Sequence, residues 1–213
     1  MALVRLTSIN DNSFWAAWKI EEPSADLLAH TQLSPQHLAE WRTVRHPLKS
    51  LEWLASRAAL AAVLNKLGLP VFGTHKDDKG KPYLNNGAYC ISLANAYPYG
   101  VAMVHKHASV GIDIELPSNK LCRTQHKFLN HSEIELADNR PSYLCAYWCV
   151  KEAIYKLYGR KLLSFKDQIR VNSLRIADGL YAEAAITNTA RHDAHYRLEG
   201  TIVDGFYVMY VVI

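Results

Sequence analysis

Two long segments with helical periodicity, each flanked by strand-type segments, constrain the fold of this chain most. In residues 48–67 the apolar side chains recur at helical spacing, and Gly68 ends the run. Residues 141–158 start at a proline, which suits the first position of a helix, and stop before Gly159. The sequence therefore predicts an α+β fold in which each half carries one long helix and several strands.

Short strands and helices fill the rest of the chain. Branched and aromatic residues cluster between turn signals in the segments expected to be strands, and Asp204-Gly205 is a strong signal for a hairpin turn. Ser34 followed by a proline predicts the start of a short helix. The expected strands are residues 4–9, 14–20, 89–93, 99–105, 110–115, 180–186, 196–203 and 206–213, and the expected short helices are 35–44 and 131–138.

The composition excludes several classes of protein. The 213 residues are 49% hydrophobic, which is ample for a buried core, and no stretch approaches the roughly 18 consecutive apolar residues of a membrane span. The 24 basic and 20 acidic residues form no basic block of the kind that binds nucleic acid. A secretion signal and CxxC spacing are both absent. We therefore expect a cytoplasmic protein with four buried thiols and with neither membrane nor nucleic acid as a partner.

Residues 110–115 carry two acidic side chains on one predicted strand. Side chains alternate along a strand, so Asp113 and Glu115 project to the same face while Ile112 and Ile114 point to the core. Two carboxylates on one face repel each other unless a cation lies between them, and oxygen ligands suit Mg²⁺. The alternative is an ordinary solvated strand face, because this spacing of acidic residues is common.

The second long helix carries a carboxylate and an ammonium. Glu152 and Lys156 stand four residues apart, so they share one helix face with Trp148. Taken alone, the pair is typical of a helix-stabilising ion pair on the surface, which contributes only about 0.3–0.5 kcal/mol. Neither the acidic strand nor the Glu152–Lys156 pair indicates a function alone, so the sequence around them is needed to interpret both.

Several elements of the sequence occur in the order found in 4'-phosphopantetheinyl transferases, a family that the chain resembles. GIDIE at 111–115 and WCVKEAIYK at 148–156 resemble the paired signature of that family. The resemblance covers about residues 45–160. The further similar elements are Gly80-Lys81-Pro82, the FxxxxE segment at 128–133, and residues 51–57, which resemble the helix that supplies a coenzyme A-binding arginine.

The resemblance implies a fold and an assembly. By its length the chain is similar to the surfactin-synthetase-associated type, which is monomeric and built from two halves. The implied fold is α+β, with two similar halves that each pack a small antiparallel sheet on a long helix. The halves would comprise residues 1–109 and residues 110–213, of which the second carries the metal-binding motifs. The active site would lie in the cleft between them.

The resemblance also implies an activity, the Mg²⁺-dependent transfer of the 4'-phosphopantetheine arm of coenzyme A to a serine of an apo acyl or peptidyl carrier protein. Adenosine 3',5'-bisphosphate is released, and the carrier serves fatty-acid, polyketide or nonribosomal-peptide biosynthesis. By the resemblance, the metal ligands are Asp113, Glu115 and Glu152, the catalytic residues are Glu152 and Lys156, and the residues that bind coenzyme A are Arg57, Lys81, Asn95, Lys151 and Lys156.

Residues 94–96 depart from the family pattern. Where the family carries Ser-His-Ser, this chain has Ala-Asn-Ala, so Asn95 replaces an imidazole that helps to hold coenzyme A phosphate. His37 and Glu40 stand roughly where the family has lysines for the 3'-phosphate. The candidates to substitute for those lysines are Arg42, Arg45 and Lys49.

These departures leave an alternative function open. A catalytically weakened relative would bind coenzyme A or a carrier protein without transfer, although the three carboxylates argue against it. A Mg²⁺-dependent phosphohydrolase is a further alternative, but the sequence lacks a nucleophile motif for that reaction.

Overall fold

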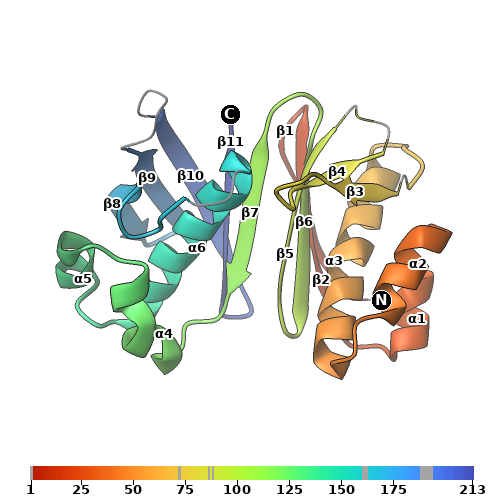
Figure 1. Ribbon diagram of the computed structural model, residues 1–213, viewed down its shortest axis with the longest axis horizontal. Helices are drawn as coiled ribbons and strands as arrows, with labels where there is room; N and C mark the ends of the chain where they lie inside the picture. The colour runs from red at the N-terminus through yellow and green to blue at the C-terminus, as the bar shows by residue number, and fades with distance from the viewer. Residues whose placement is uncertain (1, 72, 86, 88, 160–162, 188–193) are drawn as a thin grey trace. The chain divides into compact units, whose positions relative to one another are not determined.

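The structure is a computed structural model that describes residues 2–71, 73–85, 87, 89–159, 163–187 and 194–213. Its elements fall into two compact units, Met1–Val110 and Gly111–Ile213 (Figure 1). Each unit combines an antiparallel sheet with helices, which confirms the predicted α+β fold. Across the ranges described, the helices are all too short or too polar to cross a membrane.

The described part of unit 1 contains six strands and three helices. The strands are β1 (Leu3–Asn10), β2 (Ser13–Lys19), β3 (Thr74–Lys76), β4 (Pro82–Leu84), β5 (Cys90–Ala96) and β6 (Tyr99–His105), and the helices are α1 (Ser24–Ala29), α2 (Pro35–Arg42) and α3 (Pro47–Lys66). The strand order in the sheet is β1-β2-β6-β5-β4-β3. The central strand β6 is antiparallel to both neighbours, with Met103 opposite Trp15 of β2 and Ser92 of β5.

Helix α3 supplies the core of unit 1. Pro47 begins the helix at a position where no backbone N–H donor is needed. Leu54 and Ala58 are fully buried against the sheet. A Cβ added to Gly100 of β6 would lie only 2.2 Å from the backbone nitrogen of Ser56. The backbones of α3 and β6 are therefore in direct contact at this point.

Unit 2 is built around a five-stranded sheet. Its elements are β7 (Val110–Glu115, which begins at the unit boundary), α4 (Asn119–Thr124), the short 3-10 helix η1 (Gln125–Lys127), α5 (His131–Ala137), α6 (Pro141–Tyr158), β8 (Ile169–Ile176), β9 (Leu180–Ile186), β10 (Ala194–Val203) and β11 (Phe206–Val212). The strand order is β7-β11-β10-β9-β8. Helix α6 ends where Gly159 adopts a left-handed backbone with φ of 63°.

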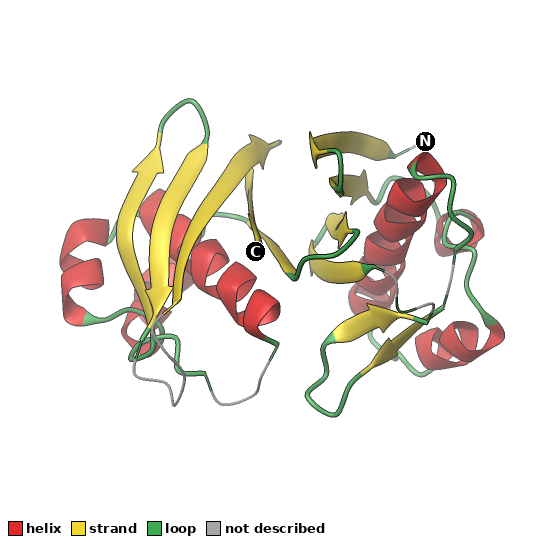
Figure 2. Ribbon diagram, turned by 90° about the horizontal axis from the view of Figure 1, so that it is seen from above, coloured by secondary structure: helices red, strands yellow, loops and turns green. Residues whose placement is uncertain are grey.

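Apart from β1, which has no counterpart among the described strands of unit 2, the two units share one topology. In unit 1 the strand before the long helix, β2, pairs with the last strand β6, and the order continues as β5-β4-β3. In unit 2 the strand before the long helix, β7, pairs with the last strand β11, and the order continues as β10-β9-β8. Figure 2 shows that each long helix lies against one face of its own sheet. The prediction of two similar halves, each a sheet packed on a long helix, is confirmed.

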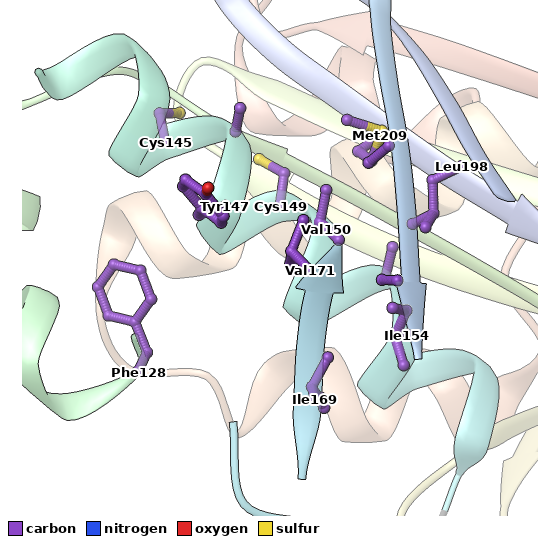
Figure 3. Packing of buried hydrophobic residues seen from close by; sticks show 14 of the residues in the cluster. Phe128, Cys145, Tyr147, Cys149, Val150, Ile154, Ile169, Val171, Leu198 and Met209 are labelled. Atoms are coloured by element: carbon purple, nitrogen blue, oxygen red, sulfur yellow. The ribbon is translucent and has the colours of Figure 1, made fainter. Parts of the chain in front are cut away.

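The core of unit 2 lies between α6 and its sheet. Figure 3 shows Val150 and Ile154 of α6 beside Val171 of β8 and Leu198 of β10. All four side chains are at most 6% exposed. Helix α6 is therefore fixed by packing against strands from the C-terminal end of the chain, and this packing holds the charged side chains of α6 in place.

The four cysteines are all free thiols. Cys145 and Cys149 of α6 are buried one helical turn apart, as predicted. Cys90 and Cys122 are only half-buried, because they lie at the start of β5 and on the short helix α4. The prediction of buried thiols is wrong for these two residues.

Several short elements were not predicted, namely α1, α4, β3, β4 and β8. The expected strand at 89–93 is shifted and longer, since β5 runs from Cys90 to Ala96. The expected helix at 35–44 ends earlier, at Arg42. The hairpin at Asp204-Gly205 is present, with φ of 47° and 84° at its two residues.

Candidate active site

Strand β7 brings the predicted acidic residues against helix α6. A Cβ added to Gly111 would lie 1.9 Å from the carbonyl oxygen of Ala153, so only glycine permits this contact between the strand and the helix. Ile112 and Ile114 are buried in the core of unit 2, as the alternation predicts. The helix residues that flank Ala153 include Glu152, which is therefore close to the acidic strand.

Asp113 is held by the ammonium group of Lys156. Its side chain is only 8% exposed, and Lys156 Nζ donates to Asp113 Oδ1 at 2.6 Å and to the carbonyl oxygen of Ile112 at 3.1 Å. Within the described ranges, Asp113 Oδ2 is buried and has no hydrogen-bond partner. Burial raises the pKa of Asp113, and the charge of Lys156 opposes this rise. Hydrogen bonds from the Cys149 thiol and from the backbone of Ile114 also act on this carboxylate and lower its pKa.

Glu152 and Glu115 complete the acidic group. Burial raises the pKa of Glu152 to about 7, the negative charges of Asp113 and Glu115 add to the rise, and Lys156 opposes it. Glu115 is half-buried, and its Oε1 accepts a hydrogen bond from the backbone of Leu116 at 3.0 Å. The structure therefore brings the three predicted metal ligands and Lys156 into one electrostatic group.

The acidic strand and the helix with Glu152 and Lys156 lie within one matched segment. Residues 109–211 match the family model of the 4'-phosphopantetheinyl transferase superfamily. None of the curated proteins compared with the chain matches it. At the level of the superfamily, the match supports phosphopantetheinyl transferase activity, with coenzyme A and a carrier protein as the general partners.

The acidic group of this matched segment has the donor chemistry for a hard divalent cation. Its acidic side chains offer carboxylate oxygens, one of which is the buried Oδ2 of Asp113. Burial raises the pKa of Glu152 most, and the like charges of Asp113 and Glu115 add to the rise; a cation between the carboxylates would remove this second contribution. In the part of the chain that the structure describes, no three His, Cys, Asp or Glu side chains are grouped closely enough to form a ready-made metal site. The acidic residues are chemically suited to bind Mg²⁺. In this structure, the positive charge beside Asp113 comes from Lys156.

Lys151 does not face a ligand site. Its side chain is 0% exposed, and Nζ donates to Glu133 Oε2 at 2.7 Å and to the carbonyl oxygens of Phe165 at 2.8 Å and Ile169 at 2.7 Å. An ammonium has three protons, so all of its donors are used inside the protein. We therefore withdraw Lys151 from the residues expected to bind coenzyme A.

Glu133, the acidic residue of the FxxxxE segment, has a role that the sequence reasoning did not assign. Its Oε2 accepts from Lys151 and from the backbone of Asn130 at 3.0 Å, and its Oε1 accepts from the backbone of Val171 at 2.9 Å. Asn130 and Glu133 form a capping box at the start of α5. One buried carboxylate thus joins α5, α6 and β8. The Asn-x-x-Glu spacing was a signal for the cap, but it does not reveal the burial.

Arg57 of α3 is held on an aromatic ring in unit 1. Its guanidinium carbon lies 3.8 Å from the centroid of the Trp53 ring, and Nη1 donates to Ser56 Oγ at 3.0 Å. Burial lowers the pKa of Arg57 to about 10, against the charge of Glu40, so the group is protonated at neutral pH. Within the described ranges, its Nε is buried without a hydrogen-bond partner. Such a cation has spare capacity for an anionic ligand.

The other residues predicted to bind coenzyme A in unit 1 lie on or beside the sheet. Asn95 is exposed on β5, and Lys81 is half-buried just before β4, where burial lowers its pKa. His37 is buried, with Nε2 2.7 Å from the carbonyl oxygen of Thr74, so it joins α2 to β3. Glu40 pairs with Lys76. The three basic candidates for the 3'-phosphate, Arg42, Arg45 and Lys49, are exposed.

A cavity of about 620 Å³ opens beside Glu115 in unit 2. Aromatic side chains form much of its wall, and Phe128 and Phe165 lie 5.1 and 5.6 Å from the ring of Trp148 between centroids. The lining residues are Glu115, Ser118, Lys120, Leu121, Thr124, Lys127, Phe128, Trp148, Ser164 and Phe165. The cavity therefore combines an apolar wall with a carboxylate at one end.

The crowding of carboxylates predicts a pH-dependent gain of stability in Glu152→Gln. The pKa of Glu152 is about 7 in the folded protein and ordinarily 4.5, so the ionised carboxylate destabilises the folded state. This destabilisation is absent below pH 4.5, grows between pH 4.5 and pH 7, and is complete above pH 7. In EDTA at pH 8 we expect the free energy of unfolding of the variant to exceed that of wild type by about 1–2 kcal/mol, after allowance for screening by solvent. Urea unfolding at pH 8 and pH 4.5 measures the difference, which should vanish at pH 4.5.

The matched control is Glu135→Gln. Glu135 lies on α5 with its side chain 66% exposed, so its neutralisation should leave the unfolding free energy nearly unchanged at both pH values. An equal stability of Glu152→Gln and wild type at pH 8 would contradict the repulsion described for the acidic group.

Proposed function

We propose that this protein transfers the 4'-phosphopantetheine group of coenzyme A to a serine of an apo acyl or peptidyl carrier protein in a Mg²⁺-dependent reaction. The observation that carries the proposal is the buried Oδ2 of Asp113 beside Glu152, whose pKa is raised, within a segment that matches the transferase superfamily. A buried carboxylate oxygen without a partner is costly unless a ligand satisfies it. That cost favours a binding role over a purely structural one.

The reaction joins the serine oxygen to the β-phosphorus of coenzyme A and breaks the bond from that phosphorus to the bridging oxygen. Glu152 takes the serine proton as the general base. Lys156 neutralises the leaving phosphate or donates a proton to it, and adenosine 3',5'-bisphosphate departs. Because Lys156 is bound to Asp113 at 2.6 Å, this role requires its ammonium to turn from Asp113 toward the phosphate.

Asp113, Glu115 and Glu152 would hold the magnesium ion. When bound, Mg²⁺ supplies positive charge that stabilises the pyrophosphate in the transition state. The carboxylates contribute the ligands, and burial of Asp113 excludes water from one side of the site. Arg57 and Lys81 in unit 1 would contact the nucleotide phosphates, and exposed Asn95 would replace the family's imidazole with a neutral amide donor.

The cavity beside Glu115 would receive the pantetheine arm. The arm begins at the pyrophosphate, which we place at the carboxylates, and its branched aliphatic part suits the aromatic wall that Trp148 and Phe165 form. The hydroxyls of Ser118 and Thr124 in the lining offer partners for the amide groups of the arm. The cavity volume of about 620 Å³ is within the range of small-molecule sites.

We also propose that the protein is a monomer of the surfactin-synthetase-associated type. One chain supplies two units that each pack a sheet on a long helix, and apart from β1 their strand orders correspond, so a single chain already contains both halves of this fold.

Intact mass spectrometry tests the proposed reaction. The protein is incubated with coenzyme A, Mg²⁺ and a panel of apo carrier proteins, and a carrier should gain the mass of one phosphopantetheine. EDTA should abolish this gain and added Mg²⁺ should restore it, since the site offers only oxygen ligands. If coenzyme A binds but no carrier in the panel is modified, the alternative of a binding protein without transfer is favoured.

A further inference from the structure

A buried carboxylate in unit 1 holds a turn that none of the predicted functions uses. Glu52 of α3 is 5% exposed, and its Oε1 accepts a hydrogen bond from the backbone nitrogen of Tyr97 at 3.1 Å. Its Oε2 accepts from the ammonium of Lys49. A buried carboxylate that faces the backbone of a turn 45 residues away is an uncommon and costly arrangement. It therefore calls for a reason beyond the stability of the helix.

The turn that Glu52 holds joins β5 to β6. Asn95 is paired with Gly100 across this hairpin, and Gly100 presses against the backbone of Ser56 in α3. Two contacts thus fix the hairpin end on the helix, the hydrogen bond from Tyr97 to Glu52 and the close approach at Gly100. The same helix carries Arg57 immediately after Ser56.

We propose that Glu52 is a positioning residue that sets the affinity for coenzyme A by holding Asn95 at a fixed place relative to Arg57. This inference rests on the proposed function, since it assumes that these two residues contact the nucleotide. Without the carboxylate, the Tyr97 amide would lose its acceptor, and the hairpin end would keep the contact at Gly100 and the hydrogen bond from the Ile20 backbone to the carbonyl oxygen of Pro98 at 2.7 Å. The chemistry at the carboxylates of unit 2 would be unaffected, so the effect belongs to binding and not to turnover.

The test compares three variants of Glu52 in the full chain. Glu52→Met keeps most of the volume but removes the acceptor, Glu52→Gln keeps an acceptor oxygen, and Glu52→Ala removes both volume and acceptor. Calorimetry should give a dissociation constant for coenzyme A that is about tenfold higher in the Met and Ala variants and within about twofold of wild type in the Gln variant. In transfer assays, KM for coenzyme A should rise with kcat unchanged.

Hydrogen exchange of the Tyr97 amide, followed by NMR, reports on the anchor directly. Protection should be lost in Glu52→Met and kept in Glu52→Gln. The matched control is Glu22→Ala, which removes another carboxylate of unit 1 that accepts a hydrogen bond, from Trp18 Nε1 at 3.0 Å, and should change neither protection nor affinity.

The outcomes separate this inference from the proposed function. If wild type binds no coenzyme A, the proposed function fails, while exchange at Tyr97 still reports whether Glu52 anchors the turn. If wild type binds coenzyme A and Glu52→Met binds it equally well, the positioning role is overturned. If the Met and Ala variants do not fold while Glu52→Gln does, the hydrogen bond serves the fold alone, and the inference is likewise wrong.

Discussion

Replacing Asp113, Glu115 or Glu152 by alanine is expected to lower the rate of phosphopantetheine transfer at least about a hundredfold. This corresponds to a loss of about 2.7 kcal/mol of transition-state stabilisation. The reason is that each carboxylate is proposed to hold the ion that stabilises the pyrophosphate, and Glu152 additionally takes the serine proton. Single-turnover transfer to an apo carrier protein, followed by intact mass, measures the loss.

Folding and surface charge are controlled in the same experiment. Circular dichroism and urea unfolding should show that the three variants remain folded, because the core of unit 2 is formed by apolar side chains of α6 and the sheet, which these substitutions leave in place. Glu135→Ala, which removes an exposed carboxylate from the same unit, should transfer at the wild-type rate. A near-normal rate in any of the three variants would refute the metal assignment of that residue.

Lys151→Met is expected to lower the free energy of unfolding by about 3–5 kcal/mol, because it leaves the carboxylate of Glu133 buried without its cation. The side chains of this pair are 0% and 1% exposed, so water cannot compensate. Burial lowers the pKa of Lys151, and the nearby Glu133 opposes this shift. Equilibrium urea unfolding at pH 7 measures the change.

Two further variants separate burial from charge. Arg197→Met breaks an ion pair with Glu183 whose side chains are 90% and 57% exposed, and it should change the unfolding free energy by no more than about 0.5 kcal/mol. The double variant Lys151→Met with Glu133→Gln should recover part of the lost stability, since no unpaired charge is left. An unchanged unfolding free energy in Lys151→Met would mean that Glu133 is protonated or solvated when its partner is removed.

The elements predicted well from the sequence are those with local start and stop signals. Helix α6 begins at Pro141 and ends before Gly159, two residues whose backbone preferences are strong. Strand β8 was missed because polar residues interrupt its apolar pattern, and a register shift between Val171 and Ser173 breaks the alternation. Its position in the sheet depends on pairing with β9, which local sequence does not encode.

In the candidate site, too, local sequence patterns predicted part of the arrangement, and tertiary packing determined the rest. Spacing along the strand placed Asp113 and Glu115 on one face, because the alternation of a strand is geometric, whereas the grouping of Glu152 with them came from the family resemblance. Spacing could not reveal that Lys151, directly beside Glu152, points into the core, since the face that a helix buries is chosen by its packing partners. The role of Glu133 was hidden for the same reason, because its partners come from three separate elements.

The contact between Gly111 and Ala153 has a consequence for how the protein can vary. Gly111 lies directly against the carbonyl group of Ala153, so the separation of β7 from α6 at this point is set by contact between their backbones. Side chains elsewhere in the core can exchange volume with their neighbours, whereas a backbone contact has no rotamer through which to adjust. Core side chains around this contact can be exchanged for others of similar volume. Residue 111 cannot be replaced in this way, because any side chain there would clash with the backbone of α6.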